Sequence, residues 1–270
     1  MSVNKGRQLE IERIAEKVRD ECKVTDYGFH NIFEAAEKMG YRVIRYPIGS
    51  RSFLGFALIK DTERIIFSNS SQILSREIFS AAHEMGHQQL HLSEQGKTMI
   101  RDDDFEERDE DEIEANYFAA CLLMPREKID TFIRLGLNDK KITSWTGLDI
   151  ARIQTAFNVS YDMALIRLKT LGILYGRLLD DLKLEKMEKT TSSLLSAIKG
   201  NSDLCRSSEA KKIPAEYLEW VISNYYDKLI PRKSLETALS YVDLNADDFI
   251  DPIEELDEDE SLEDMLRGMD

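Results

Sequence analysis

The chain has 270 residues and a net charge of −15, with 42% hydrophobic and 32% charged residues. This composition is typical of a soluble globular protein that buries a sizeable core. No apolar run approaches the roughly 20 residues that span a bilayer, so we expect no membrane partner. The N-terminal residues are charged where a signal peptide would be apolar. Three scattered cysteines favour a reducing cytoplasm without a disulfide framework.

The negative charge is concentrated at the C-terminus. Residues 243–270 hold thirteen acidic side chains and one arginine, whereas the preceding residues carry a net charge of only −3. Nucleic-acid binding requires the opposite sign, so we expect no direct contact with nucleic acid. The tail is instead expected to be disordered and solvated, with docking on a basic protein partner as the alternative.

Hydrophobic periodicity predicts a mixture of helices and strands in the first part of the chain. The predicted elements are helices over residues 8–22 and 31–39, followed by strands over 41–46, 53–59 and 64–67. The last of these strands is a candidate exposed edge that could pair with an extended substrate. Ser70 or Ser71 is expected to cap the next helix, which has one apolar face.

The second part of the chain is expected to be all helical. Helices over 148–157 and 161–171, separated by a short turn, form a helix-turn-helix-like pair. This pair carries few basic residues, so we expect it to pack structurally and not to recognise DNA. Further expected segments are a helix over 177–198, a polar linker over 200–208, and helices over 215–229 and 234–241.

Three of the four histidines lie within nine residues, and the stretch begins with an H-E-x-x-H motif. Two histidines four positions apart on a helix are separated by about 40° of rotation and about 6 Å of rise, so they face the same side. His83 and His87 can therefore share one metal ion, while Glu84 can reach a water molecule on that ion. The motif predicts bound zinc and hydrolysis of a peptide bond, with Glu84 as the base.

A catalytic zinc takes three protein ligands. His91 would lie about 12 Å of rise from His83 on a continuing helix, so we do not expect it to bind the ion. Glu114, on the next helix, is the expected third ligand because it belongs to an apolar face where an unpaired carboxylate is costly. Glu110 and Glu112 are expected to be solvated at the start of that helix. Three side chains remain candidates for stabilising the oxyanion: Tyr117, His91 and Arg126.

The H-E-x-x-H motif belongs to a longer set of stretches. They are R-I-I-F-S-N at 64–69, A-H-E-M-G-H at 82–87 with His91 following, E-A-N-Y-F-A-A at 114–120 leading to L-L-M-P at 122–125, F-N-V-S at 157–160 and R-L-K-T-L-G at 167–172. The set resembles the ImmA/IrrE family of zinc metallopeptidases over about residues 8–175. The resemblance implies a small zincin fold that holds Zn2+ through two histidines and a downstream acid. It also implies cleavage of helix-turn-helix repressors, which switches on stress-response or mobile-element genes.

We therefore expect an α+β fold with a small zincin-like metallopeptidase core, built from helices and a three-stranded sheet. An all-helical C-terminal region and an acidic tail should follow. The expected divisions are 1–125 for the metallopeptidase core, 126–176 for the helix-turn-helix-like region, 177–242 for the C-terminal helices and 243–270 for the tail.

The predicted function is that of a cytoplasmic zinc endopeptidase that cleaves a regulatory protein, with His83, His87 and Glu114 on the metal and Glu84 as base. The regulatory protein is expected to be a DNA-binding repressor. The alternative is a non-catalytic or antitoxin-like binding module that uses the acidic tail to hold a basic partner. The intact Glu84 favours the peptidase, because binding alone requires no general base.

Overall fold

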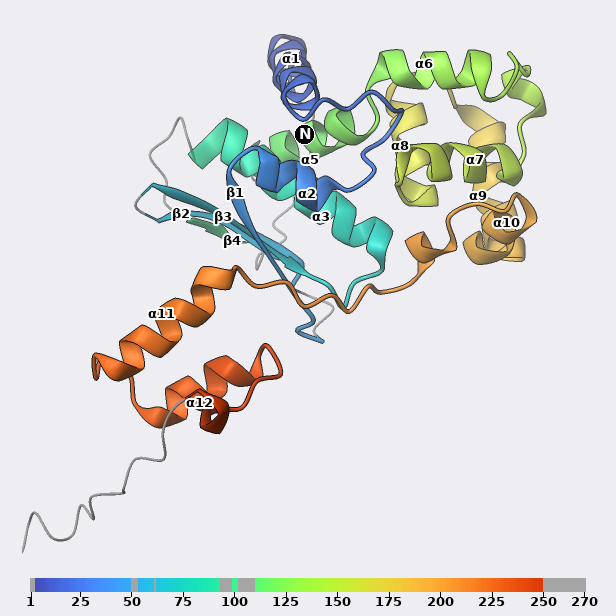
Figure 1. Cartoon of the computed structure of the whole chain (residues 1–270). Coiled ribbons are helices and arrows are strands. Elements are labelled where there is room, and N and C mark those ends of the chain that lie inside the picture. Colours follow the sequence, from blue (N-terminus) through green and yellow to red (C-terminus); the bar gives the residue numbers. More distant parts are fainter. Residues whose placement is uncertain (1–2, 50–52, 61, 93–98, 102–109, 250–270) are drawn as a thin grey trace, which may run out of the picture. The chain divides into compact units, whose positions relative to one another are not determined.

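The computed structural model describes residues 3–49, 53–60, 62–92, 99–101 and 110–249 (Figure 1). The chain divides into two compact units, Met1–Ile213 and Pro214–Asp270. This division differs from the expected domain boundaries, because residues 177–213 belong to the first unit and share its hydrophobic core. Among the described residues, no helix has both the length and the apolarity that crossing a bilayer requires.

A four-stranded sheet lies in the first unit, in the order β1-β3-β2-β4. The strands are β1 (Tyr41–Tyr46), β2 (Gly55–Lys60), β3 (Glu63–Asn69) and β4 (Met99–Arg101). β1 runs parallel to β3, whereas β2 is antiparallel to both β3 and β4. The sheet thus has one strand more than the three expected. β3 pairs on both sides, so the prediction that it forms an exposed edge is wrong.

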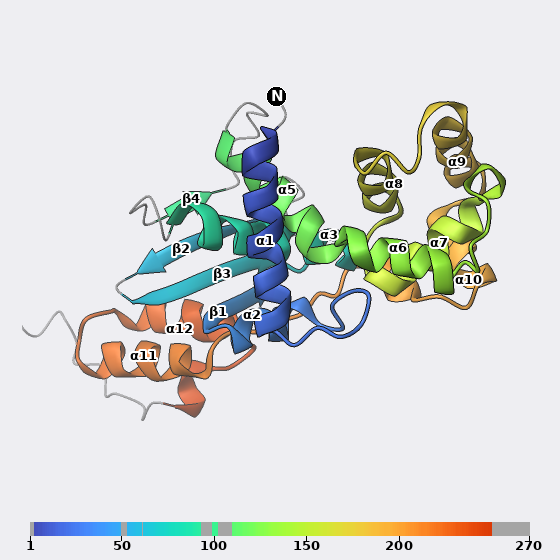
Figure 2. The same ribbon diagram turned by 90° about the horizontal axis from the view of Figure 1, so that it is seen from above.

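Three helices form successive layers above one face of this sheet (Figures 1 and 2). α3 (Leu74–His87) packs on β2 and β3, α5 (Glu110–Leu123) packs on α3, and α1 (Lys5–Glu21) packs on α5. α2 (Ile32–Lys38) contacts both β1 and α3. α5 therefore has neighbours on two sides, and its buried apolar residues include Ala115, Phe118 and Leu122.

Two buried arginines bind the C-terminal end of α5 and the residue that follows it. Arg19 of α1 donates to the carbonyl oxygen of Leu122 at 2.9 Å, and Arg167 donates to that of Met124 at 3.0 Å. Burial lowers the pKa of Arg19 to about 10, so its guanidinium remains charged at neutral pH. Carbonyl groups at a helix end lack partners within the helix, and a cation there also complements the helix dipole.

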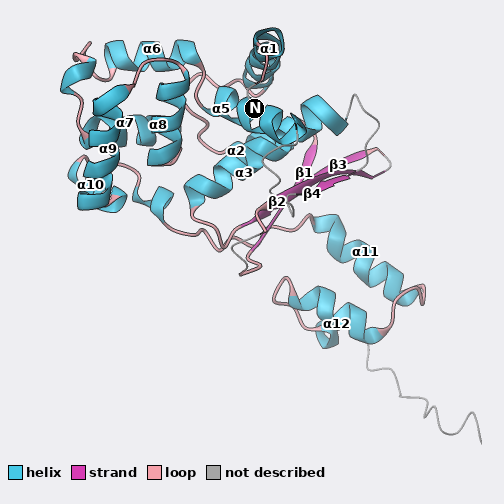
Figure 3. Cartoon of the chain, turned by 180° about the vertical axis from the view of Figure 1, so that it is seen from behind, coloured by secondary structure: helices cyan, strands magenta, loops and turns pink. Residues whose placement is uncertain are grey.

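The helices that follow lie beside the sheet and its three layers (Figure 3). Their buried apolar residues belong to the same hydrophobic core. They are α6 (Arg126–Leu135), the short 3-10 turn η2 (Ile142–Ser144), α7 (Gly147–Phe157), α8 (Tyr161–Thr170), α9 (Gly176–Lys189) and α10 (Thr191–Ala197). The predicted helix-turn-helix-like pair corresponds to α7 and α8, joined through Asn158 in the left-handed conformation. The single helix expected over 177–198 is interrupted at Thr190, whose φ is 53°.

The chain then returns to the sheet through residues 202–213, which follow the edge of β1. After the 3-10 turn η3 (Ser202–Cys205), the backbone of Lys212 exchanges two hydrogen bonds with that of Arg45. The carbonyl of Arg206 accepts from the first amide of α3, that of Leu74. Neither Ser70 nor Ser71 caps α3, because the hydroxyl of Ser70 donates instead to the carbonyl of Ala210 and no side chain caps the helix.

The second unit has a small core of its own. This unit contains α11 (Ala215–Tyr226), α12 (Arg232–Ser240) and the 3-10 turn η4 (Ala246–Asp248). Its buried apolar residues are Val221, Leu235, Leu239 and Ala246. The expected acidic tail lies outside the described residues from position 250 onward.

Candidate metal centre

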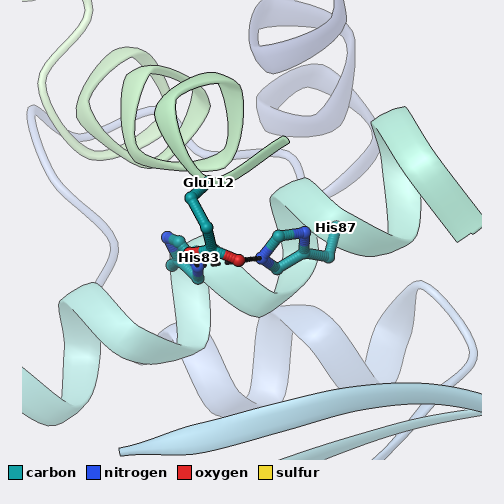
Figure 4. Close-up of side chains that lie close together, drawn as sticks. All are labelled: His83, His87 and Glu112. Atoms are coloured by element: carbon teal, nitrogen blue, oxygen red, sulfur yellow. Dashed lines mark hydrogen bonds and ion pairs between the residues drawn. The ribbon is translucent and has the colours of Figure 1, made fainter. Parts of the chain in front are cut away.

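Two histidines of α3 point the same way from one face of the helix (Figure 4). Their rings are buried, with His83 4% exposed and His87 fully buried. Their Nε2 atoms lie 2.9 Å apart, and their ring centroids are 4.6 Å apart. The prediction that His83 and His87 share one face of a helix is therefore confirmed.

Glu112, in the first turn of α5, faces this pair of nitrogens. Its Oε2 lies 3.1 Å from Nε2 of His83, and its Oε1 lies 3.1 Å from Nε2 of His87. Burial acts to raise the pKa of Glu112, but hydrogen bonds to His83 and His87 outweigh it and hold the pKa well below its usual range. The carboxylate is therefore ionised at neutral pH, as a metal ligand must be.

These three groups have the chemistry and spacing of a metal site. Ligand atoms of His83, His87 and Glu112 all lie within 4.8 Å of one another. Tetrahedral zinc binds such atoms at about 2.0–2.2 Å, which places neighbouring donors about 3.3 Å apart. The observed separations of 2.9 and 3.1 Å differ from that value by only a few tenths of an ångström. Two imidazoles and one carboxylate also form a donor set suited to zinc and other divalent transition metals.

Glu114, the expected third ligand, does not meet the two histidines. Its carboxylate faces α1, where Arg7 donates to both oxygens at 2.9 and 2.7 Å. The expectation that Glu112 is solvated is also wrong, because its side chain is 22% exposed and lies against the histidines. Successive residues of a helix are 100° apart, so Glu112 and Glu114 leave α5 on nearly opposite sides.

His91 lies behind His87, on the side of the ring away from Glu112. The Nδ1 atoms of His87 and His91 are 3.0 Å apart, and Nε2 of His91 lies 3.3 Å from Oε2 of Glu114. His91 belongs to η1 (Gln88–Leu92), a single π-helical turn that continues α3. Burial lowers the pKa of His91, which favours the neutral ring. His91 thus contacts His87 without joining the three converging groups.

Asn116 supports the other histidine. Its Oδ1 lies 3.2 Å from Nδ1 of His83. An amide oxygen only accepts hydrogen bonds, so Nδ1 of His83 donates to it and Nε2 is the ring nitrogen left for a metal ion. A hydrogen bond to the ring nitrogen that does not face the metal fixes the tautomer and orientation of metal-binding histidines.

Gly86 allows α3 and α5 to approach closely enough for Glu112 to reach the histidines. A Cβ atom built at this position would lie 3.1 Å from Cα of Ala115 and 3.1 Å from Cδ1 of Phe118. Any larger residue would therefore require Ala115 and Phe118 to shift by a few tenths of an ångström. The glycine inside the H-E-x-x-H motif thus has a packing role that the sequence analysis did not assign.

Glu84, the expected base, is 1% exposed. Its side chain lies against Gly55 at the start of β2, where a Cβ atom would come within 3.1 Å of Oε1 of Glu84 and 2.7 Å of the carbonyl oxygen of Phe67. The absence of a side chain at Gly55 therefore leaves room for the carboxylate between α3 and the sheet.

Two of the candidate oxyanion donors have other partners. The hydroxyl of Tyr117 donates to Glu12 of α1 at 2.6 Å, on the side of α5 that faces α1. Arg126 is exposed at the start of α6, 3.8 Å from Asp130. The third candidate, His91, is the ring already placed behind His87.

Comparison with known proteins assigns the region that carries this site. Residues 36–169, from α2 to α8, match a family model described as the IrrE N-terminal-like domain, a peptidase family. A comparison with curated proteins found no match. The matched region includes all three converging residues and Glu84, within a metallopeptidase-type domain. The chain therefore belongs to the ImmA/IrrE family.

Proposed function

We propose that the chain is a zinc-dependent endopeptidase that cleaves a regulatory protein. The observation that carries this proposal is the convergence of His83, His87 and Glu112, with Glu84 directly following the first histidine. Two histidines and one carboxylate form the protein ligand set typical of catalytic zinc, which keeps its fourth position for water. A purely structural zinc site would have four protein ligands and would need no adjacent glutamate.

Each residue of this site has a defined task in hydrolysis. His83, His87 and Glu112 would hold the ion through two nitrogens and one carboxylate. When bound, zinc supplies Lewis acidity that polarises a carbonyl group and makes water more acidic. Glu84 accepts a proton from the attacking water on its carboxylate and then delivers it to the leaving amine nitrogen. The burial of Glu84 limits its exchange of protons with bulk water.

The substrate class that we propose is a helix-turn-helix repressor in the cytoplasm, in line with the family to which the chain belongs. An extended segment of such a substrate could add to the sheet beside β4, which ends the strand order. The opposite end of the sheet is less accessible for such pairing, because Lys212 already occupies the edge of β1 at Arg45.

The test compares purified full-length chain, loaded with zinc, with its Glu84→Gln variant. Each is incubated with helix-turn-helix repressors encoded beside the chain's own gene, and products are identified by mass spectrometry. We expect the variant to keep its zinc and to cleave about 100- to 10,000-fold more slowly. Glu110→Gln is the matched control, because Glu110 is an exposed acid at the start of α5.

Equal cleavage by the wild type and the Glu84→Gln variant would overturn the peptidase assignment. A repressor that binds the zinc-loaded wild type and stays intact would support the non-catalytic binding module instead. In that case, truncation after residue 242 tests whether the acidic tail holds the partner.

A further inference from the structure

A chain of polar contacts connects the N-terminal helix to the candidate metal centre. Arg7 of α1 donates to Glu114 through Nε at 2.9 Å and through Nη2 at 2.7 Å. Both side chains are only about one-fifth exposed, at 20% and 19%. A forked pair of this kind fixes the position and the plane of the carboxylate, which a single ammonium group would not do.

The fixed carboxylate in turn contacts His91. Oε2 of Glu114 lies 3.3 Å from Nε2 of His91, and Oδ1 of Asp111 lies 3.7 Å from the same nitrogen. An ionised carboxylate can only accept a hydrogen bond, so Nε2 of His91 carries the proton. In the neutral ring the other nitrogen, Nδ1, then has a lone pair.

That lone pair of His91 faces His87. Because the two Nδ1 atoms are 3.0 Å apart and His91 accepts, His87 donates from Nδ1. With Nδ1 of His87 used as the donor, Nε2 is the ring nitrogen left for a metal ion between His83 and Glu112. The opposite direction of this hydrogen bond would place the proton on Nε2 of His87 and would block metal binding there.

We infer that Arg7 is a positioning residue of the metal centre, acting through Glu114 and His91 to hold His87 in its metal-binding tautomer. This inference rests on the proposed function only in requiring that His83, His87 and Glu112 bind a metal. Arg7 lies outside the family-matched region, residues 36–169. The N-terminal helix is thus part of the metal centre, although it supplies no ligand.

The experiment measures the zinc affinity of the full-length chain by competition with a chromogenic chelator. Arg7→Met removes the fork but keeps much of the side-chain volume. Its matched control is Arg13→Met, at an exposed position on the same helix. We expect Arg7→Met to weaken zinc binding about 10-fold, within the range for second-shell partners, and Arg13→Met to leave it unchanged.

Two further variants separate positioning from a general effect on folding. His91→Asn keeps an acceptor oxygen near the place of Nδ1, whereas His91→Leu removes it, so Asn should retain more zinc affinity than Leu. If Arg7 acts through His91, then combining Arg7→Met with His91→Leu should cost no more affinity than His91→Leu alone. A purely structural role for Arg7 would instead lower the urea midpoint of the metal-free protein and would add to the effect of His91→Leu.

Wild-type zinc affinity in the Arg7→Met variant would overturn the inference, as would full additivity with His91→Leu. Either result leaves the proposed function intact if His83→Ala still abolishes zinc binding. Wild-type zinc affinity in the His83→Ala variant would overturn both the proposed function and the role of Arg7, because the metal would then bind elsewhere.

Discussion

Gly86 of α3 lies directly against Ala115 of α5, so closely that a Cβ on the glycine would be 3.1 Å from Cα of the alanine. Glu112 lies one helical turn before Ala115 and reaches both histidines from there. The distance between the two helices thus determines whether the carboxylate meets the imidazoles.

A substitution of Gly86→Ala should therefore weaken both the fold and the metal centre. Overpacking of a buried contact costs about 1–3 kcal/mol of the free energy of unfolding. Displacing α5 should also lower zinc affinity, measured by chelator competition beside a urea titration. Gly6→Ala is the control, because Gly6 is an exposed helical position where a Cβ would make only an ordinary contact at 3.4 Å. A Gly86→Ala protein with unchanged stability and affinity would show that the helices can separate without consequence.

Glu112 and Glu114 should differ strongly in their effect on metal binding. Loss of a ligand removes a metal bond, so we expect Glu112→Ala to reduce zinc affinity by about 100-fold or more. Loss of a second-shell group has a smaller effect, about 10-fold for Glu114→Ala. Metal content after dialysis and chelator competition would measure both. The reverse order of the two effects would return the ligand role to Glu114.

The stability of the helical part should depend on the ionisation of Asp149. Burial acts to raise the pKa of this carboxyl, but hydrogen bonds from Lys140 at 2.6 Å and from the amide of Thr146 at 2.8 Å outweigh it and lower the pKa. A lowered folded-state pKa adds stability above the unfolded value, near 3.8, and this stability is lost as the pH falls through the folded-state pKa.

Asp149→Asn should therefore reduce the free energy of unfolding by about 1–3 kcal/mol at pH 7. The difference from the wild type should shrink as the pH falls below the ordinary aspartate value. Urea titrations between pH 7 and pH 3 would measure this, with Asp180→Asn as an exposed control on α9. A penalty that stays constant over this range would exclude ionisation as its cause.

Truncation should show that residues 201–213 stabilise the first unit. Leu204 is 1% exposed, and the backbones of Arg206 and Lys212 bond to α3 and β1. A chain ending at residue 213 should keep the stability and zinc affinity of the first unit. A chain ending at residue 200 should lose about 2–4 kcal/mol, comparable to removing one large buried side chain. Equal urea midpoints for the two truncations would contradict this role.

Local patterns in the sequence predict most of the helices and strands, because apolar residues recur with the period of each element. The spacing of His83 and His87 also predicts their shared face, which depends only on helix geometry. The break at Thr190 and the fourth strand are not predicted. The fourth strand depends on pairing with β2, which is distant in the sequence, whereas Thr190 ends α9 and caps α10 through the nearby Ser193.

The convergence of Glu112 with the two histidines is missed for a different reason. α5 packs between α3 and α1, so it has two buried sides, and an apolar neighbourhood did not distinguish Glu112 from Glu114. The small residues at Ala115 and Ala119, three and seven positions after Glu112, would have indicated the side that closes on Gly86. The pairing of Glu114 with Arg7 could be predicted only if the packing of α1 against α5 were already known.

The two arginines at the end of α5 have a consequence for how the family can vary. Arg19 and Arg167 anchor Leu122 and Met124 to α1 and α8, so the helix is held at the end remote from His83 and His87. The number of residues between Glu112 and this anchored end therefore fixes where the carboxylate lies relative to the histidines. One residue gained or lost in α5 between Glu112 and this anchor would rotate the carboxylate away by 100°.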